Sequence, residues 1–365
     1  MSIFKIFLKH PVFFLGIALS VAACKQPDTK IDKARQVVSH AMEEQHIVGL
    51  AISVIRDGEI VWNEGFGFAD LENKTSVDPA ATMFRVGSVS KAITATAAAK
   101  LYEKGQLDLS KDVREYVPYF PSKKYPITVR HLAAHTSGIR HYSGDPREYY
   151  SRKRYNSVKE SLTIFMDDSL HFKPGERWRY ASLGFNTLSA VIEGASGKSF
   201  LSCLQDELFD PLGMEHTSAD FNDCVIVGRS GHYEYDTIAG KIVNTAFVDN
   251  SYKWAGGGLL SSSLDLAKLG WAWHNNEIVG DSTRRLFISP QQLNDGSYTD
   301  YGLGWDLYDD LDVPSYGHGG TAVGGKGTIR IFPEYNMVIA IATNTWKIDY
   351  GNELNEIVKI FIAGP

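Results

Sequence analysis

Residues 87–101 have the sequence GSVSKAITATAAAKL, in which Ser88-Val89-Ser90-Lys91 forms a Ser-x-x-Lys motif. The alanine-rich run that follows predicts a helix that begins at the serine. Residues three apart lie on one face of a helix, so the Lys91 amine can reach the Ser88 hydroxyl at the positive end of the helix dipole. Burial lowers the pKa of a lysine and lets it act as a base near neutral pH. The motif therefore predicts a serine nucleophile with a lysine base.

The same motif occurs a second time, at Ser2-Ile3-Phe4-Lys5. Context separates the two copies, because the copy at residues 2–5 falls in an expected N-terminal signal that is removed. Lys91 instead lies in a nearly all-apolar helix, where an unpaired lysine is costly. The alternative, an exposed lysine on a helix face, fits these neighbours poorly.

Strand-like segments lie near the N-terminus. Residues 50–55 and 59–62 flank Asp57-Gly58, a dipeptide that accepts positive φ and predicts a tight hairpin turn. Before them, apolar residues at three- and four-residue spacing predict an amphipathic helix over residues 31–42.

The C-terminal end has a similar organisation. Residues 328–332 and 337–342 are strand-like, and a last helix capped by Asn352 follows them. The apolar stripe of that helix consists of Leu354, Ile357, Val358 and Phe361.

Strands at both ends around a helical middle predict one antiparallel sheet assembled from the two ends, flanked by helices, beside a mostly helical lobe. The fold class is thus α/β of the α+β kind. The sheet lobe covers about 31–87 and 290–365, and the helical lobe about 88–289. The cleft between the lobes is the expected active site. The charged and aromatic segment 142–161 is either a solvated loop or a gate over that cleft.

Two further short motifs follow in chain order, Tyr180-Ala181-Ser182 and His318-Gly319-Gly320-Thr321. In order and spacing, the three motifs resemble the Ser-x-x-Lys, Tyr-x-Asn and Lys-Thr-Gly motifs of the serine beta-lactamase and penicillin-binding protein superfamily, in its class C-like branch. Other segments that look like landmarks of this branch are residues 135–138, 211–214 and 301–305. Residues 137–142 and 248–258 are similar to its mitochondrial, serine beta-lactamase-like members. The resemblance implies the beta-lactamase/transpeptidase-like fold.

The resemblance also implies roles for individual residues. Ser88 is the nucleophile, Lys91 is its base, and Tyr180 shuttles protons to the leaving group. By position, the N–H groups of Ser88 and Thr321 hold the oxyanion, and such donors are each worth about 2.7–4 kcal/mol. The predicted substrate-binding residues are Ser182, His318, Gly319, Gly320 and Thr321.

Two departures from the family pattern concern substrate recognition. Ser182 stands where asparagine is usual, and His318 replaces a lysine that would hold a substrate carboxylate. With an ordinary pKa of about 6.5, His318 is expected to bind an anion more strongly as the pH falls. Because a neutral imidazole binds an anion poorly, weak and slow acylation by penicillins is expected. No acidic deacylation motif of the class A kind is recognisable, so efficient antibiotic hydrolysis would need the tyrosine-based route.

The leading hypothesis is a serine hydrolase that acts through an acyl-Ser88 intermediate on a peptide, amide or ester. The alternatives are a beta-lactamase or D-alanyl-D-alanine carboxypeptidase, and a non-catalytic scaffold or assembly-forming protein. The joint presence of Ser88, Lys91 and Tyr180 argues against the scaffold. No metal or organic cofactor is expected, because His131 and His135 lack the glutamate of a zinc-protease motif and packing or loop bonding explains them better.

The N-terminus predicts export and a lipid anchor. Residues 1–23 combine two lysines with an apolar stretch too short to span a bilayer, which is typical of a secretory signal. The stretch ends in Val-Ala-Ala-Cys, which resembles the lipoprotein box, so Cys24 is the expected lipid attachment site. Two acyl chains give stable membrane attachment. We therefore expect a tether over 24–30 and a hydrolase domain over 31–365, located in the cell envelope.

Composition supports a globular, exported protein. The 365 residues are 44% hydrophobic and 12% aromatic, enough for a large core. The formal net charge of −6, which becomes −8 without the signal, argues against a nucleic-acid partner. Cys203 and Cys224 remain after Cys24, and whether they pair is left open. Residues 254–258 either line the cleft or form a packing turn.

Overall fold

The computed structural model describes residues 29–311 and 313–363. The predicted signal, Cys24 and most of the tether lie outside these residues. A seven-stranded sheet of order β3-β2-β1-β12-β11-β10-β9 forms the centre of the molecule. Its strands are β1 (Gly49–Arg56), β2 (Glu59–Asp70), β3 (Thr75–Ser76), β9 (Asp306–Tyr308), β10 (Ser315–Ala322), β11 (Gly325–Phe332) and β12 (Met337–Thr343).

The sheet joins the two ends of the chain, as predicted. Asp57 and Gly58 have φ values of 53° and 85°, which is the backbone that a two-residue hairpin between β1 and β2 requires. Strand β1 then pairs with β12 in antiparallel register from Leu50↔Thr343 to Arg56↔Met337. Strand β12 pairs with β11, and β11 pairs with β10. The sheet therefore contains the predicted third motif, His318-Gly319-Gly320-Thr321, on β10.

The helices are α1 (Thr29–Glu44), α2 (Val89–Glu103), α3 (Val129–Ala133), α4 (Pro146–Tyr149), α5 (Val158–Leu162), α6 (Ser182–Ser196), α7 (Phe200–Leu204), α8 (Asp210–Leu212), α9 (Trp254–Gly257), α10 (Ser263–His274), α11 (Asp281–Phe287) and α12 (Gly351–Ile362). Shorter turns of helix are η1 (Val113–Glu115), η2 (Gln205–Phe209) and η3 (Pro333–Tyr335). Two small sheets complete the fold, with orders β13-β6-β7 and β4-β8-β5. Their strands are β4 (Phe84–Arg85), β5 (Thr217–Ala219), β6 (Tyr233–Asp236), β7 (Lys241–Asn244), β8 (Leu259–Ser261) and β13 (Thr345–Trp346).

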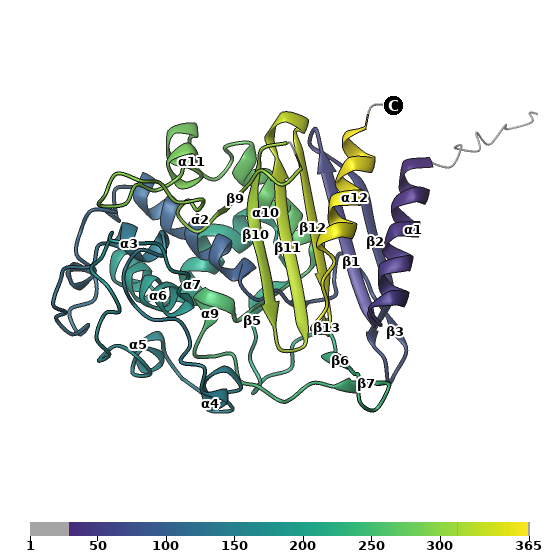
Figure 1. Cartoon of the computed structure of the whole chain (residues 1–365), viewed down its shortest axis with the longest axis horizontal. Helices are drawn as coiled ribbons and strands as arrows, with labels where there is room; N and C mark the ends of the chain where they lie inside the picture. Colours follow the sequence, from purple (N-terminus) through teal and green to yellow (C-terminus); the bar gives the residue numbers. More distant parts are fainter. Residues whose placement is uncertain (1–28, 312, 364–365) are drawn as a thin grey trace, which may run out of the picture.

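The large sheet is covered on both faces. Helices α1 and α12 lie side by side over one face, and α10 packs on the other, against which the helical lobe is built (Figure 1). Strand β1 is accordingly buried along nearly its whole length. The predicted apolar stripe of α12 is buried in one core cluster with residues of α1 and of the sheet. The helix begins at Gly351, however, and Tyr350, not Asn352, occupies the N-cap position. The prediction that Asn352 caps this helix was therefore wrong.

Two other findings bear on the predictions from sequence. Cys203 is buried, Cys224 is exposed, and neither forms a disulfide. Within residues 29–311 and 313–363, no helix has both the length and the apolar character needed to cross a bilayer.

Candidate active site

Ser88 occupies the turn between β4 and α2. Gly87 has φ of +52°, and a Cβ atom there would lie 2.6 Å from the backbone N of Thr321, so only glycine fits this turn. Ser88 follows as the N-cap of α2 with φ −66° and ψ −7°, and its side chain makes no capping hydrogen bond. Its hydroxyl is therefore free for another partner.

That partner is Lys91, one turn further along α2. Its Nζ lies 3.0 Å from Ser88 Oγ and donates to the carbonyl oxygen of Gly256 at 2.5 Å. Lys91 is fully buried and, within the described residues, makes no ion pair. Burial lowers the pKa of Lys91 well below its ordinary value, with the nearby Lys253 also lowering it and Asp306 partly opposing. The amine is thus held in a form that can accept the Ser88 proton.

Tyr180 lies against the same pair. Its ring centroid is 4.7 Å from Lys91 Nζ. Burial raises the pKa of Tyr180 above its usual value, although interaction with the nearby Ser88 partly opposes this. Lys91 and Tyr180 are therefore shifted in opposite directions, the arrangement that separates a base from an acid in one site.

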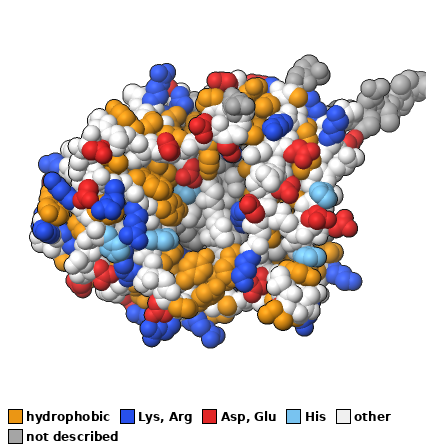
Figure 2. Space-filling view, viewed as in Figure 1, with side chains coloured by type: hydrophobic (Ala, Val, Ile, Leu, Met, Phe, Trp, Pro, Cys, Tyr) orange, Lys and Arg blue, Asp and Glu red, His pale blue; other side chains and the backbone are white. Residues whose placement is uncertain are grey.

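A cavity of about 390 Å³ opens in front of Ser88. Figure 2 shows a hollow near the middle of one face, lined largely by backbone and uncharged polar side chains, with hydrophobic side chains along its lower rim. Strand β10 contributes Gly319, Gly320 and Thr321 to the lining, and the helical lobe contributes His141, Tyr142, Tyr149, Tyr180, Ser182 and Lys253. Segment 142–161 thus does border the cleft.

Comparison with known proteins places this geometry in a family. The sequence matches the Beta-lactamase family over residues 34–360. This chain belongs to that family. The mitochondrial serine beta-lactamase-like protein LACTB of Homo sapiens is 30% identical, with 83% of this chain and 72% of that protein aligned.

Solved structures agree with this assignment to the beta-lactamase family. The octameric penicillin-binding protein homologue from Pyrococcus abyssi is 27% identical, with a TM-score of 0.79 over 91% of this chain and 77% of that one. A D-stereospecific amidohydrolase from Streptomyces sp. has the same fold, with a TM-score of 0.75 at 21% identity over 92% and 99% of the two chains.

In this beta-lactamase-family protein, strand β10 touches the turn that carries Ser88. A Cβ atom on Gly320 would lie 2.5 Å from Ser88 N and 2.1 Å from Val86 O. The Ser88 N–H meets no hydrogen-bond acceptor among residues 29–311 and 313–363. The N–H groups of Ser88 and Thr321 are thus brought to adjacent backbone positions, consistent with the predicted oxyanion site.

We expect Gly320→Ala to separate β10 from Ser88, because the added methyl group meets backbone that cannot rotate away. Covalent labelling of Ser88 by a fluorophosphonate should fall at least about tenfold, and the melting temperature should drop. Gly319→Ala is the matched control, since a Cβ atom there meets nothing within 4 Å. Equal melting temperatures for the two variants would contradict the close approach.

His318 lies on β10, next to Gly319 of the cavity lining. It is 2% exposed and does not line the cavity. Its Nε2 lies 3.1 Å from Tyr301 Oη, and its Nδ1 lies 2.6 Å from the Gly319 carbonyl and 3.6 Å from Asp306 Oδ2. Burial lowers its pKa, partly opposed by Asp306. The structure thus places His318 beside the cavity with hydrogen-bond partners on its own strand and on Tyr301, and its contact with a substrate carboxylate stays a prediction.

The remaining residues singled out from sequence make local contacts. Thr128 N–H donates to His131 Nδ1 at 3.1 Å, and Ala181 N–H donates to His135 Nδ1 at 3.2 Å, so both histidines bond to loops as expected. Ser182 begins α6 beside Tyr180 and lines the cavity. Residues 254–258 both pack tightly and line the cavity: the residues of α9 are buried, and Gly256 and Gly257 contribute to the cavity lining.

Sequence reasoning missed several residues of the site, including two basic side chains of the cavity lining and one nearby carboxylate. Lys253 and His141 line the cavity, and Asp306 lies close enough to raise the pKa of Lys91. The first two fall inside the segments that resemble mitochondrial serine beta-lactamase-like proteins, which was the available signal. For Asp306, beside the 301–305 landmark, no chemical pattern in the sequence marks a function.

Proposed function

We propose that this member of the beta-lactamase family is a serine hydrolase that forms a covalent acyl-Ser88 intermediate on a peptide, amide or ester substrate. The observation that carries this proposal is the 3.0 Å contact between Ser88 Oγ and the fully buried amine of Lys91, whose pKa burial lowers. A buried lysine without an acidic partner is costly for stability, and a base role explains its retention.

The reaction proceeds in two halves. As Ser88 Oγ attacks the substrate carbonyl, its proton passes to Lys91 Nζ, and the N–H groups of Ser88 and Thr321 stabilise the oxyanion. The carbonyl–leaving-group bond then breaks as the Tyr180 phenol donates its proton to the leaving group and Lys91 returns a proton to Tyr180. Water attacks the acyl-serine by the same route in reverse, releasing the acid and restoring Ser88.

A labelling experiment tests this function. The protein is incubated with a fluorophosphonate or a fluorescent penicillin, and the adduct is mapped by mass spectrometry. We expect an adduct on Ser88, rapid with the fluorophosphonate and slow with the penicillin. Hydrolysis of a D-Ala-D-Ala peptide, compared with a simple ester and an L-peptide, separates a carboxypeptidase from a broader peptidase or esterase. No adduct with either reagent would support the non-catalytic alternative.

We also propose that the protein works in the cell envelope, held to a membrane by a lipid on Cys24. The support is the Val-Ala-Ala-Cys sequence after an apolar signal. We expect Cys24→Ala to move the exported protein from the membrane fraction to the soluble fraction, because two acyl chains would be lost. Cell fractionation with immunoblotting measures this, and Cys224→Ala is the control. Retention of the substituted protein in the detergent phase of a phase separation would contradict the lipid anchor.

A further inference from the structure

The charged side chains that line the cavity are all of one sign. Two lysines line it, Lys253 and Lys326, and no aspartate or glutamate is among its described lining residues. This contrasts with the chain as a whole, whose formal net charge is −6. A cavity lined by one sign of charge raises the local concentration of ligands of the opposite sign.

The two lysines differ in what they contact. Lys326 Nζ bonds the Ile348 carbonyl at 3.0 Å and Asp349 Oδ1 at 3.2 Å. Lys253 is 3% exposed, and its side chain makes no hydrogen bond or ion pair within the described parts of the chain. Of these two cations, Lys253 is therefore the one that is buried and lacks an acidic partner among the described residues.

Aromatic rings surround the Lys253 ammonium group. Its Nζ lies 5.1, 5.3 and 5.8 Å from the ring centroids of Tyr149, Tyr252 and Tyr142. Such rings attract a cation but do not replace the hydrogen bonds that it loses on leaving water. Burial lowers the pKa of Lys253 to about 7, with Arg85 adding to the effect and Asp220 opposing it. An anion in the cavity would supply the missing partner.

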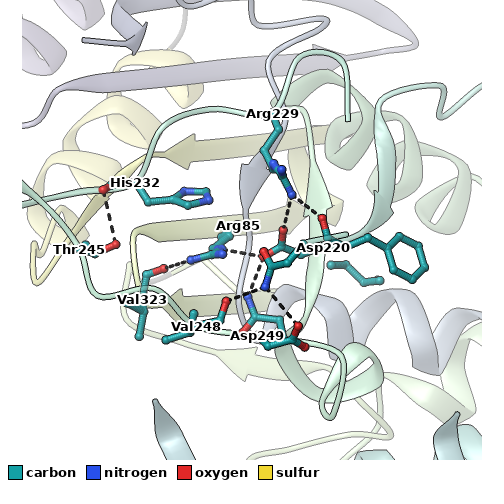
Figure 3. Close-up of polar contacts among 12 residues, drawn as sticks. Arg85, Asp220, Arg229, His232, Thr245, Val248, Asp249 and Val323 are labelled. Carbon is teal, nitrogen blue, oxygen red and sulfur yellow. Dashed lines mark hydrogen bonds and ion pairs between the residues drawn. The ribbon is translucent and has the colours of Figure 1, made fainter. Parts of the chain in front are cut away.

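The loop that carries Lys253 is held rigidly. Figure 3 shows Arg85 and Arg229 converging on Asp220, and Arg85 also donates to the Val323 carbonyl, after β10. Asn250 Nδ2 donates to Asp220 Oδ2 at 2.8 Å, which ties residues 248–253 to this network. The Lys253 backbone is fixed further, because its N–H donates to Asn250 O at 3.1 Å. The ammonium group is therefore preorganised toward the cavity.

We propose that Lys253 binds an anionic group, such as a carboxylate, of the substrate that acylates Ser88. This inference rests on the proposed serine-hydrolase function and adds a substrate class to it. Because Lys253 shares the cavity lining with Thr321 and Lys326, the anion lies toward the end of β10 that leads into β11. The subsite thus differs from the His318 position predicted from sequence.

The test uses two 4-nitrophenyl esters of matched shape, the monoester of glutaric acid and its carboxamide analogue. We expect the parent protein to prefer the acid, measured as the ratio of kcat/KM for the two esters. In Lys253→Met this ratio should fall at least about tenfold, because the variant keeps the shape of the side chain but loses the charge. Lys253→Arg should restore most of the preference.

A control variant separates a specific subsite from a general effect of positive charge. Lys326→Met should change the ratio by less than about twofold, since that lysine is paired already. A loss in Lys326→Met equal to that in Lys253→Met would assign the preference to the general field of the cavity and overturn the proposal. An unchanged ratio with a lower melting temperature in Lys253→Met would likewise overturn it, because Lys253 would then be a structural residue.

The proposed function and this inference fail in different ways. Absence of a fluorophosphonate adduct on Ser88 in the parent would refute the proposed function. Normal labelling of Ser88 with no preference for the acid would refute only the anion subsite. If neither ester is turned over, protection of Ser88 from the fluorophosphonate by glutarate but not glutaramide, lost in Lys253→Met, supports the subsite. Equal protection by the two compounds contradicts it.

Discussion

Ser88→Ala is expected to eliminate covalent labelling and to lower kcat/KM for a reactive ester by at least about 10³-fold, because the proposed acyl intermediate forms on the Ser88 hydroxyl. The substitution removes one hydroxyl from an N-cap whose side chain makes no capping bond. The fold should therefore be preserved, with a melting temperature close to that of the parent. Residual hydrolysis near the parent rate would show that another residue is the nucleophile.

Ser90→Ala is the matched control, since it removes the other hydroxyl of the motif. Ser90 Oγ donates to Gly87 O at 2.7 Å and accepts from Leu259 N at 3.2 Å in a fully buried position. Its loss should cost about 1–3 kcal/mol of the free energy of unfolding, while Ser88 still reacts with the fluorophosphonate. Opposite phenotypes for the two serines would separate the nucleophile from the structural hydroxyl.

Lys91→Met is expected to slow acylation of Ser88 by about 10²–10⁴-fold, because it removes the base and keeps the volume of the side chain. The pH dependence gives a second readout. The unprotonated amine is the active form, so acylation should rise with pH through the pKa of Lys91, which burial places well below the ordinary 10.5. Above that pH the rate should stay high as long as the Tyr180 phenol is protonated. Burial raises the pKa of Tyr180, which extends this range.

The measurement is the rate of fluorophosphonate labelling between pH 5 and 10 in the parent and in Lys91→Met. In Lys91→Met the labelling rate should be low, and its rise with pH through the pKa of Lys91 should disappear. Tyr180→Phe is the control, because it keeps Lys91 and should retain that rise at a lower rate. A parent rate that begins to rise only near the pKa of an ordinary lysine would contradict the assignment of Lys91 as the base.

The sequence was most informative where the relevant contacts are local. The Ser88–Lys91 contact follows from helical spacing, and the hairpin at Asp57-Gly58 follows from the backbone that these two residues accept. The burial of Leu354 and Phe361 follows from their spacing on one helix face. The exact start of α12 was not predictable to the residue, because helix ends depend on neighbouring packing.

The remaining parts of the site depend on contacts that a local pattern cannot reveal. His318 and Gly320 are two residues apart on β10, so they share the face that packs on the start of α2. Gly320 leaves room for the Ser88 backbone, whereas the imidazole of His318 is buried. Lys253 reaches the cavity only because its loop is tied to Asp220 and to the tyrosines of segment 142–161, which are distant in sequence.

The pairing of β1 with β12 has a consequence for the order in which the protein can form during synthesis. Strand β1 leaves the ribosome long before its partner β12, because the whole helical middle of the described chain lies between them. Non-local strand pairs of this kind form slowly, and domains fold as units once their parts are present. Strand β10 therefore cannot pack against Ser88 until the segment from β10 to β12 has been made. A nascent chain that ends before β10 would carry Ser88 and Lys91 without the strand that completes the proposed site, so we expect Ser88 to be unreactive in it.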